Sequence, residues 1–523
     1  MNPEVLRSFV PRELAGNAAN LFTYLPVIRV LVYTDDPTQV TDDVGATGFS
    51  IGLMKKFQNA NQPAFANVEF ILLSRNVLGV NPELTEAGHA KEKLTASLLA
   101  QYHQVWFFGV HLSNLTAVEW KPDITRRGGP ESELTDPEVD NLRAWMGSNA
   151  SAGGMMGGVL VSGDHSEPKN PTAVPADLPA TLSLGRALGR RVPRAHQLRV
   201  WEGGPTTKAA NSYNTQEQGD ECSLDDINLQ DDNIPQRLIL PRSESGCPHP
   251  LFIGKDGKVL TMFPDHIHEG EVIVTDATTN PQDADWPNGG PEPVVVAYGT
   301  DKRKPVIYKI VAVYDGDSVG VGRIASDSTW HHFFNSNLIG FKDDASPDSV
   351  ANRLGQYYSN LAVWLSPLHM RRTMARAMFW WLAYHPLVAA EASGSGLSDL
   401  DGLLRVGNIA GALLARVAGL SEIQALLSAY GPPPLLAQAE ALHFPTGGMT
   451  LTTLPSRELV LGSVIKSYYQ SPATEAVGMF EEAKDDASAL IDRGVSDAFR
   501  THAEQFRAMA EKALADSDNL LKL

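Results

Sequence analysis

The chain contains 523 residues with a mass of 56.6 kDa and a formal net charge of −18 at pH 7. Hydrophobic residues make up 43% of the sequence and charged residues 20%, which excludes a disordered, collagen-like or coiled-coil chain. The acidic balance excludes a general binder of nucleic-acid backbones, which needs a basic surface. The length predicts two or more domains.

Cysteine content and apolar patterning predict a cytoplasmic protein with no membrane span. Cys222 and Cys247 are too few for a disulfide scaffold, so we expect both to be reduced. Residues 1–20 lack the continuous apolar core of a signal peptide. The most apolar later stretch, Ala377–Ala390, is shorter than the roughly 20 residues that span a bilayer and predicts a buried helix.

Short apolar runs alternate with helix-like segments in the first part of the chain. Four runs predict buried strands, at Val27–Tyr33, Val68–Leu73, Val105–Val110 and Gly158–Gly163. Helical patterns lie between them, at Gly45–Asn59, at Leu84–Gln101 and from Thr135 onward. This alternation predicts an α/β domain with a mostly parallel sheet and helices on both faces.

The remaining chain divides into a polar insertion, further strands and a helical region. Residues 203–247 are polar and lack periodicity, which indicates a surface insertion. Later strands are expected at Lys258–Phe263, Glu271–Asp276, Pro293–Tyr298, Val306–Tyr314 and Gly322–Asp327. Residues 346–523 show almost no strand signal and predict a separate helical C-terminal domain after an α/β domain at 1–345, with helices at 471–492 and 496–514 among others.

Titratable residues repeatedly follow the predicted strands. Ligands of parallel α/β sheets bind outside the carboxyl ends of the strands, so these residues are candidates for a site. Asp164 and His165 follow the fourth strand directly. Asp35 and His111 follow the first and third strands and are secondary candidates.

The strongest local pattern is the segment Pro264–Glu271. His266 and His268 are two residues apart, so on an extended chain both imidazoles point to the same side and could bind one metal ion. Glu269 could serve as a ligand, as an orienting group or as a general base. The spacing is also compatible with histidines that bind no metal.

A second pattern follows the last predicted strand. Asp327 could bind a metal or orient an imidazole, and it precedes His331 and His332. Adjacent side chains point in different directions on a strand or helix, so one histidine is expected to reach the site. We assign His331 to the metal site with Asp327 and keep His332 as a secondary candidate. The alternative is the start of a helix, with the neighbouring aromatic residues packed into the core.

A third pattern is the sharp turn Gly163–Glu167, because such a turn after a strand often presents a nucleophile. A serine triad through Ser162 or Ser166 remains open as an alternative.

The segment from Gly157 to His165 resembles the corresponding turn of the class I glutamine amidotransferase-like superfamily, in its ThuA-like (trehalose-utilisation) branch. In that branch a histidine stands where amidotransferases have a cysteine. The segment Gly322–His332 resembles the late strand that delivers the superfamily's active-site histidine. The resemblance covers about residues 27–340 and implies a flavodoxin-like α/β fold. The nucleophilic cysteine is missing, so the chain is not expected to be a glutaminase.

The resemblance implies that the five proposed metal ligands approach one another, namely His165, His266, His268, Asp327 and His331. Imidazoles with a carboxylate suit zinc, iron or manganese. Such a metal would lower the pKa of a bound water, and Glu269 or Asp164 would act as general base.

Two functions from different classes follow from these patterns. The first is a metal-dependent hydrolase of a small polar substrate, sugars included. The second is a non-catalytic ligand-binding or scaffold protein that has lost the amidotransferase nucleophile. No nucleic-acid or membrane partner is expected, and the helical region is the expected place for self-association or a protein partner.

Overall fold

The computed structural model describes residues 25–34, 41–46, 50–74, 94–108, 136–162, 200–201, 236–242, 247–264, 271–272, 293–300, 307–328, 331–341, 346, 348–393, 397–430, 457–470 and 484–520. These residues belong to two compact units. One spans Val27–Leu368, and the other contains the helices from His369 onward.

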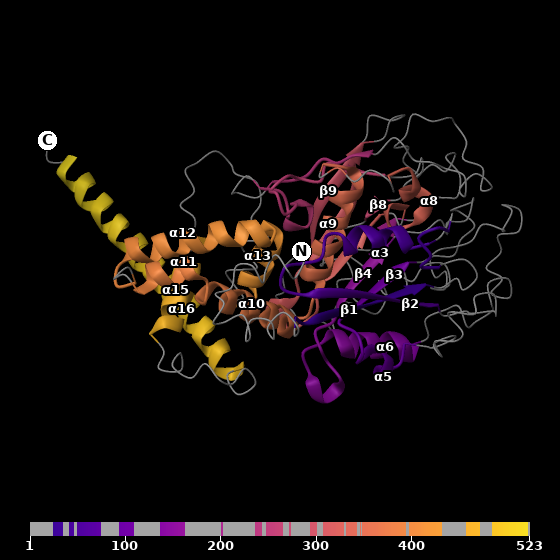
Figure 1. Cartoon of the computed structure of the whole chain (residues 1–523), viewed down its shortest axis with the longest axis horizontal. Coiled ribbons are helices and arrows are strands. Elements are labelled where there is room, and N and C mark those ends of the chain that lie inside the picture. Colours follow the sequence, from indigo (N-terminus) through magenta and orange to yellow (C-terminus); the bar gives the residue numbers. More distant parts are fainter. Residues whose placement is uncertain are drawn as a thin grey trace, which may run out of the picture. The chain divides into compact units, whose positions relative to one another are not determined.

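The first unit is built on a seven-stranded sheet of order β2-β1-β3-β4-β11-β10-β9 (Figure 1). Its strands are β1 (Val27–Thr34), β2 (Asn67–Ser74), β3 (Gln104–Phe108), β4 (Gly158–Ser162), β9 (Val294–Thr300), β10 (Ile307–Tyr314) and β11 (Ile324–Asp327). β10 is antiparallel to both neighbours, and every other neighbouring pair in this sheet is parallel. The predicted α/β class with a mostly parallel sheet is therefore confirmed.

Helices cover both faces of the sheet. α3 (Gly52–Asn59) and α9 (Val350–Leu365) lie on one face, and α5 (Ala96–Leu99) and α6 (Asp136–Met146) lie on the other (Figure 1). The strands are apolar on both sides because both faces are covered. Each of the five residues of β3 is buried. Although the sequence suggested a boundary at residues 345 and 346, α9 belongs to this α/β unit.

Two of the later predicted strands do not join the main sheet. Within Lys258–Phe263 only β7 (Met262–Phe263) is a strand, and it pairs with β6 (Gln236–Arg237). A turn at Gly257, with a φ of 75°, and a bridge from Ile253 to Val259 fold this segment back on itself. Within Glu271–Asp276 the structure describes β8 (Glu271–Val272), which pairs with β5 (Val200–Trp201).

Short helical turns complete the α/β unit. They are η3 (Ala150–Ala152), η7 (Pro250–Phe252), η10 (Asp317–Val319), η11 (His331–Phe333), α8 (Asn335–Leu338) and η12 (Ile339–Phe341). The helix expected at Gly45–Asn59 begins later, at Gly52, because residues 41–46 form a loop. Of the helix expected at Leu84–Gln101, the structure describes Ala96–Leu99, and residues 75–93 lie outside the described part.

The second unit consists of helices in the part that the structure describes. They are α10 (Leu368–Ala383), α11 (Pro386–Ser393), α12 (Leu400–Val417), α13 (Leu420–Ser428), α15 (Arg457–Tyr469) and α16 (Lys484–Leu520). The single helix predicted at Ala377–Ala390 is divided, because α10 ends at Ala383 and Pro386 begins α11. Among the described helices, none is long and apolar enough to cross a membrane.

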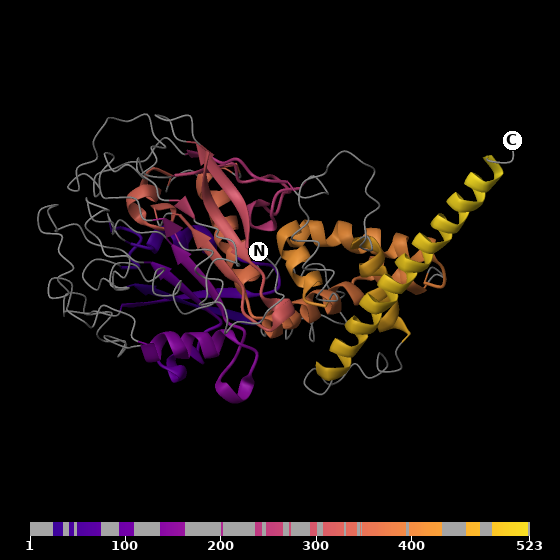
Figure 2. The same ribbon diagram turned by 180° about the vertical axis from the view of Figure 1, so that it is seen from behind.

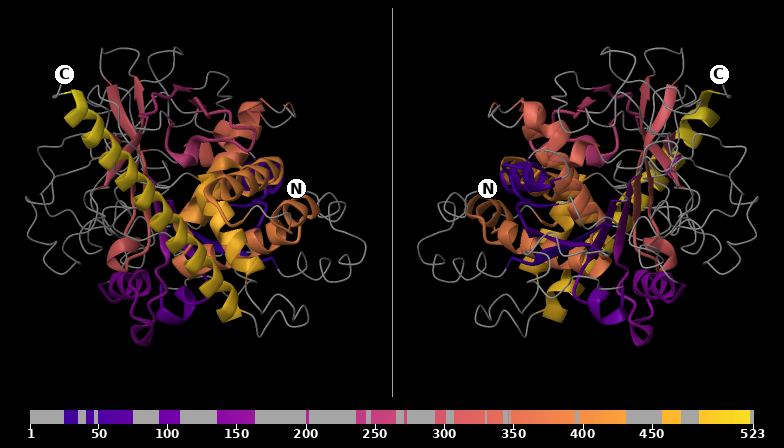
Figure 3. Two further views of the ribbon diagram at one scale, coloured as in Figure 1. Left: turned by 90° about the vertical axis from the view of Figure 1, so that its left-hand side faces the viewer. Right: turned by 90° about the vertical axis from the view of Figure 1, so that its right-hand side faces the viewer.

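The sequence predicted two helices, at 471–492 and 496–514, and the predicted break between them is wrong. α16 runs without interruption from Lys484 to Leu520 and packs against α15, as seen from behind in Figure 2 and from two sides in Figure 3. Gly494 interrupts the sequence pattern but not the helix. A Cβ at this position would lie 2.4 Å from the Cα of Val464, so glycine is needed for the close packing of α15 and α16.

Candidate functional site

The carboxyl ends of four neighbouring strands lie level at one edge of the sheet. In the strand register Thr34 is opposite Phe108, Phe107 is opposite Val161, and Ser162 is opposite Asp327. β1, β3, β4 and β11 therefore end side by side. This edge is where the sequence predicts a site.

Asp327 and His332 form a hydrogen-bonded pair at this edge. His332 Nε2 lies 2.9 Å from Asp327 Oδ2, and the hydroxyl of Tyr357 on α9 donates to the same oxygen at 3.2 Å. The main-chain carbonyl of His332 accepts a hydrogen bond from the hydroxyl of Tyr358. His332, the secondary candidate, is thus the histidine that contacts Asp327, and the assignment of His331 to a metal site with Asp327 stays a prediction.

Aromatic rings enclose the Asp327–His332 pair. The ring of Phe263 stacks on His332 with centroids 3.9 Å apart and planes 17° apart, and Phe333 lies 4.4 Å from His332 on another side. The exposed fractions of Asp327 and His332 are both 0%. The pair thus has no access to solvent in this conformation. The alternative that aromatic residues here pack into the core is confirmed for Phe333 and Phe334, both fully buried.

The hydroxyl of Ser162, a candidate nucleophile, is also engaged in a hydrogen bond. Its hydroxyl donates a hydrogen bond of 2.9 Å to the carbonyl of Phe107, and its exposed fraction is 2%. A nucleophilic serine needs its proton to face a general base. The observed hydrogen bond instead joins the ends of β3 and β4.

Most of the predicted site residues lie outside the described part of the chain. They are Asp35, His111, Asp164, His165, Ser166, His266, His268, Glu269 and the side chain of His331. Within the described part of the chain, no group of three or more His, Cys, Asp or Glu side chains could hold a metal ion. The metal site therefore stays a prediction.

Asn335 organises the loop that follows β1, and sequence reasoning did not single it out. Its Oδ1 accepts from the backbone N–H of Leu53 at 2.8 Å, which caps the start of α3 from another part of the chain. Its Nδ2 donates to the carbonyls of Asp43, at 3.0 Å, and Ala46, at 2.7 Å. Asn335 is fully buried and fixes the loop 41–46 against the helix that follows it.

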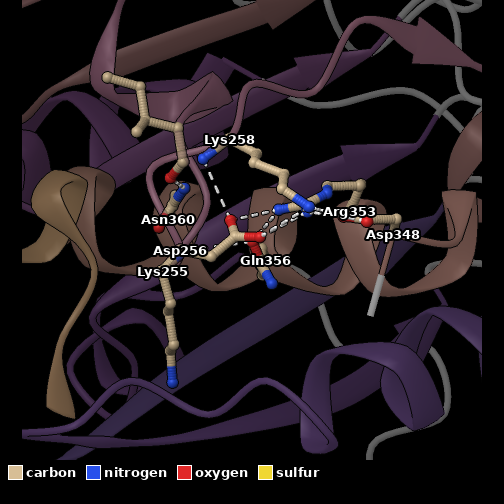
Figure 4. Close-up of polar contacts among 8 residues, drawn as sticks. Lys255, Asp256, Lys258, Asp348, Arg353, Gln356 and Asn360 are labelled. Carbon is tan, nitrogen blue, oxygen red and sulfur yellow. Dashed lines mark hydrogen bonds and ion pairs between the residues drawn. The ribbon is translucent and has the colours of Figure 1, made fainter. Parts of the chain in front are cut away.

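A charged cluster fastens the turn 254–258 to the start of α9 (Figure 4). Arg353 donates two hydrogen bonds of 2.6 Å to the two carboxylate oxygens of Asp256 and a third of 2.6 Å to Asp348. Lys258 Nζ lies 2.5 Å from Asp348 Oδ1. Two carboxylates and two cations thus neutralise one another, and the bidentate Arg353–Asp256 pair fixes the orientation of the turn.

The electrostatics of the cluster follow from Arg353. Its hydrogen bonds lower the pKa of Asp256 from 3.8 to about 2. Hydrogen bonds from Lys258 and Arg353 likewise lower the pKa of Asp348. Hydrogen bonding to Asp256 in turn raises the pKa of Arg353. Asp256, Asp348 and Arg353 are therefore ionised throughout the neutral range.

α9 also holds the chain that leads into this turn. Asn360 Nδ2 donates to the carbonyls of Leu251, at 3.1 Å, and Ile253, at 2.9 Å (Figure 4). The same segment continues to Phe263, which lies on His332. α9 thereby guides the chain that leads into Pro264–Glu271 toward the carboxyl edge of the sheet.

A third group of charged and aromatic side chains surrounds Trp364 at the end of α9. The guanidinium of Arg323 lies 4.9 Å from the indole centroid, and the ring of His249 meets the indole edge-to-face at 5.7 Å. Arg323 also pairs with Asp315 at 2.6 Å and Asp317 at 3.2 Å. Burial, aided by the charge of Arg323, lowers the pKa of His249 from 6.5 to about 3, so its imidazole is neutral.

Comparisons with known proteins assign no family. No family model matches the chain, and no curated protein matches it. Among solved structures, an mmIFT52 N-terminal domain is similar at 10% identity with a TM-score of 0.30, covering 64% of this chain and 96% of that chain. A similarity at this TM-score assigns neither a fold nor a function. The resemblance to the ThuA-like branch stays a prediction.

Proposed function

We propose that the α/β unit binds a small polar ligand at the carboxyl edge of its sheet without converting it chemically. The level ends of β1, β3, β4 and β11 support this proposal. β2 and β3 lie on opposite sides of β1, so the strand order reverses between β1 and β3. Ligands of open α/β sheets bind at such a reversal. Asp35 and His111 follow these two strands in the sequence.

We also propose that the fold is flavodoxin-like. The order β2-β1-β3-β4-β11 corresponds to the strand order 2-1-3-4-5 of that fold, with β11 as the fifth strand. The antiparallel β10 and the strand β9 extend the sheet beyond it.

The enclosure of Asp327 and His332 favours binding over hydrolysis. A general base or metal ligand must reach the substrate or the metal-bound water. Here the carboxylate bonds to His332 and Tyr357, and Phe263 covers the imidazole. The pair therefore stabilises the edge from inside the protein and does not itself contact the ligand.

The test is thermal unfolding with a panel of neutral sugars, amino sugars and small carboxylates. We expect at least one of these classes to raise Tm, because a ligand that binds the folded state stabilises it. The rise should disappear in Asp35→Ala and His111→Ala and persist in Asp140→Ala, an exposed position on α6. A rise that survives both edge substitutions would place the ligand elsewhere, and no rise with any class would reject the proposal.

A metal-dependent hydrolase is a second candidate, because of where Phe263 lies. This residue precedes His266 by three positions and contacts His332 at the sheet edge. Zinc, iron or manganese bound by His266, His268 and a further histidine would activate water. Elemental analysis of the purified protein beside the His266→Ala/His268→Ala double variant separates the two candidates. Near-stoichiometric metal in the parent and its loss in the variant would favour the hydrolase.

A further inference from the structure

The outer edge of β2 carries main-chain groups that point away from the sheet. The side chain of Gln62 shows their direction, because its Oε1 accepts from the N–H of Val68 at 2.9 Å and its Nε2 lies 3.4 Å from the Val68 carbonyl. The N–H and C=O of Val68 therefore face away from β1. Since these groups alternate sides along a strand, those of Phe70 and Leu72 face outward as well.

These outward groups form an open and regular edge. No hydrogen bond to the outward groups of Phe70 or Leu72 is present among residues 50–74 or elsewhere in the described part of the chain. β2 pairs with β1 in continuous register and contains no proline, lysine or bulge, which are the usual means of blocking an edge. The opposite edge strand, β9, differs, because its pairing with β10 shifts register and Ile239 bridges to Tyr298.

We propose that β2 pairs with β2 of a second copy of this chain, antiparallel and about a two-fold axis. Phe70 then lies opposite Leu72 of the partner subunit, and Leu72 opposite Phe70 of the partner subunit. Each pair exchanges two main-chain hydrogen bonds, so the axis generates four. The two sheets become one continuous sheet. This inference rests on the β2 edge alone and is independent of the proposed ligand site.

Charge and edge length favour a second copy as the occupant. The single charged side chain of β2, Glu69, has Arg29 Nε at 3.5 Å, so the edge is locally neutral. In the proposed register the two copies of Glu69 lie four residues apart along the ladder, or about 13 Å. This distance exceeds the Debye length of about 8 Å at physiological salt. On each strand the side chain of Gln62 binds the outward N–H of Val68, next to the four hydrogen bonds. The ladder between the two strands therefore ends at Val68, and the pairing holds two copies.

Cysteine cross-linking tests the register. The two-fold axis places Ile71 opposite itself at a non-hydrogen-bonded position, with Cα atoms about 4.5 Å apart. This distance is within disulfide range. In a Cys222→Ser/Cys247→Ser background, we expect Ile71→Cys to form a disulfide-linked dimer under mild oxidation. Glu69→Cys is the matched control and should remain monomeric, because its Cα atoms lie about 13 Å apart.

Sedimentation of the full chain tests the hydrogen bonds. We expect a concentration-dependent dimer, and Leu72→Pro should raise its Kd by roughly tenfold or more relative to Leu72→Ala. Both variants lose the same side chain, but the proline also removes the outward N–H. If Leu72→Pro fails to fold, the cross-linking pair decides alone.

A parent chain that stays monomeric at all concentrations would overturn the proposal. A dimer that cross-links no faster at residue 71 than at residue 69 would overturn it too. A monomer whose Phe70 and Leu72 amides gain protection on addition of an extended peptide would reject the second copy as the occupant.

Discussion

His332 Nε2 and Asp327 Oδ2 lie 2.9 Å apart at the end of β11, and neither residue is exposed to solvent. Tyr357 donates to the same carboxylate oxygen, and Phe263 stacks on the imidazole. A carboxylate and an imidazole in such a place are costly unless each is hydrogen-bonded. The pair therefore joins three segments, namely the end of β11, α9 and the segment that ends in Phe263.

Substitution of this pair is expected to change stability with strong coupling. Asp327→Asn and His332→Phe should each reduce the free energy of unfolding by about 1–3 kcal/mol, because the first puts an NH2 group in place of a buried carboxylate oxygen and the second takes the imidazole partner away from the carboxylate. The double variant should lose less than the sum of the two, by about 0.5–3 kcal/mol. Urea unfolding measures all three. Asp140→Asn, on an exposed part of α6, should stay within about 0.5 kcal/mol of the parent. Additive losses would show that the two side chains act independently.

The Arg353 cluster predicts a loss of stability in acid. The pKa of Asp256 is about 2 in the folded state and 3.8 in the unfolded chain. The ion pair of Asp256 with Arg353 therefore contributes stability above pH 3.8, and this stability is lost as the pH falls toward 2. The side chain of Asp256 is 39% exposed, so after allowance for solvent screening the contribution is about 1 kcal/mol. Urea unfolding at pH 7 and pH 2.5, compared between the parent and Arg353→Ala, separates this contribution from that of His249, which both proteins share.

Arg353→Ala should remove most of this acid dependence, because the pKa of Asp256 returns toward its usual value. Arg353→Lys is the matched control. It keeps the charge but loses the bidentate geometry, so part of the dependence should remain. An unchanged acid dependence in Arg353→Ala would show that another group causes it.

Sequence reasoning identified the sheet and the edge at which a site is expected, because both depend on local patterns. The strands β1 to β4 are continuous apolar runs, and their polar ends are visible in the sequence. Asp327 was a candidate because it lies at the end of a predicted strand. The structure adds that His332 contacts Asp327, a contact set by the turn of η11, while the assignment of His331 to a metal site stays a prediction.

Residues that act over long sequence distances could not be predicted in this way. Asn335 contacts the loop 41–46, which lies almost 300 positions earlier, and Arg353 contacts Asp256 across 97 positions. Each is an ordinary polar residue in its local sequence. The aromatic and apolar side chains of α9, Tyr357 and Tyr358 among them, were a usable signal, because a helix with large apolar residues on a wide face is usually covered on that face.

The neutral state of His249 predicts a second pH dependence, in a higher range. Its pKa is about 3 in the folded state and 6.5 without burial, so unfolding takes up a proton between these values. Stability is therefore full above pH 6.5 and falls as the pH decreases toward 3, by up to about 1.4 kcal/mol per pH unit. His249→Gln should flatten the dependence between pH 6.5 and 4, measured by urea unfolding. His502→Gln, on α16, is the matched control for the loss of one histidine. An equal slope in parent and His249→Gln would show that other groups titrate there.

Two glycines on α12 predict opposite effects of the same substitution. A Cβ at Gly407 would lie 1.8 Å from the backbone carbonyl oxygen of Glu458 on α15, whereas a Cβ at Gly411 would meet the guanidinium of Arg457 at 3.3 Å. Gly407→Ala must push two helices apart and should reduce the free energy of unfolding by about 1–3 kcal/mol.

Gly411→Ala is the matched control on the same helix. The flexible Arg457 side chain can move, so the higher helix propensity of alanine should stabilise the protein by up to about 1 kcal/mol. Thermal and urea unfolding of both variants measure the contrast. Equal effects at the two positions would show that backbone propensity, and not the contact of α12 with α15, governs both, since propensity alone gives the same sign at every interior glycine of a helix.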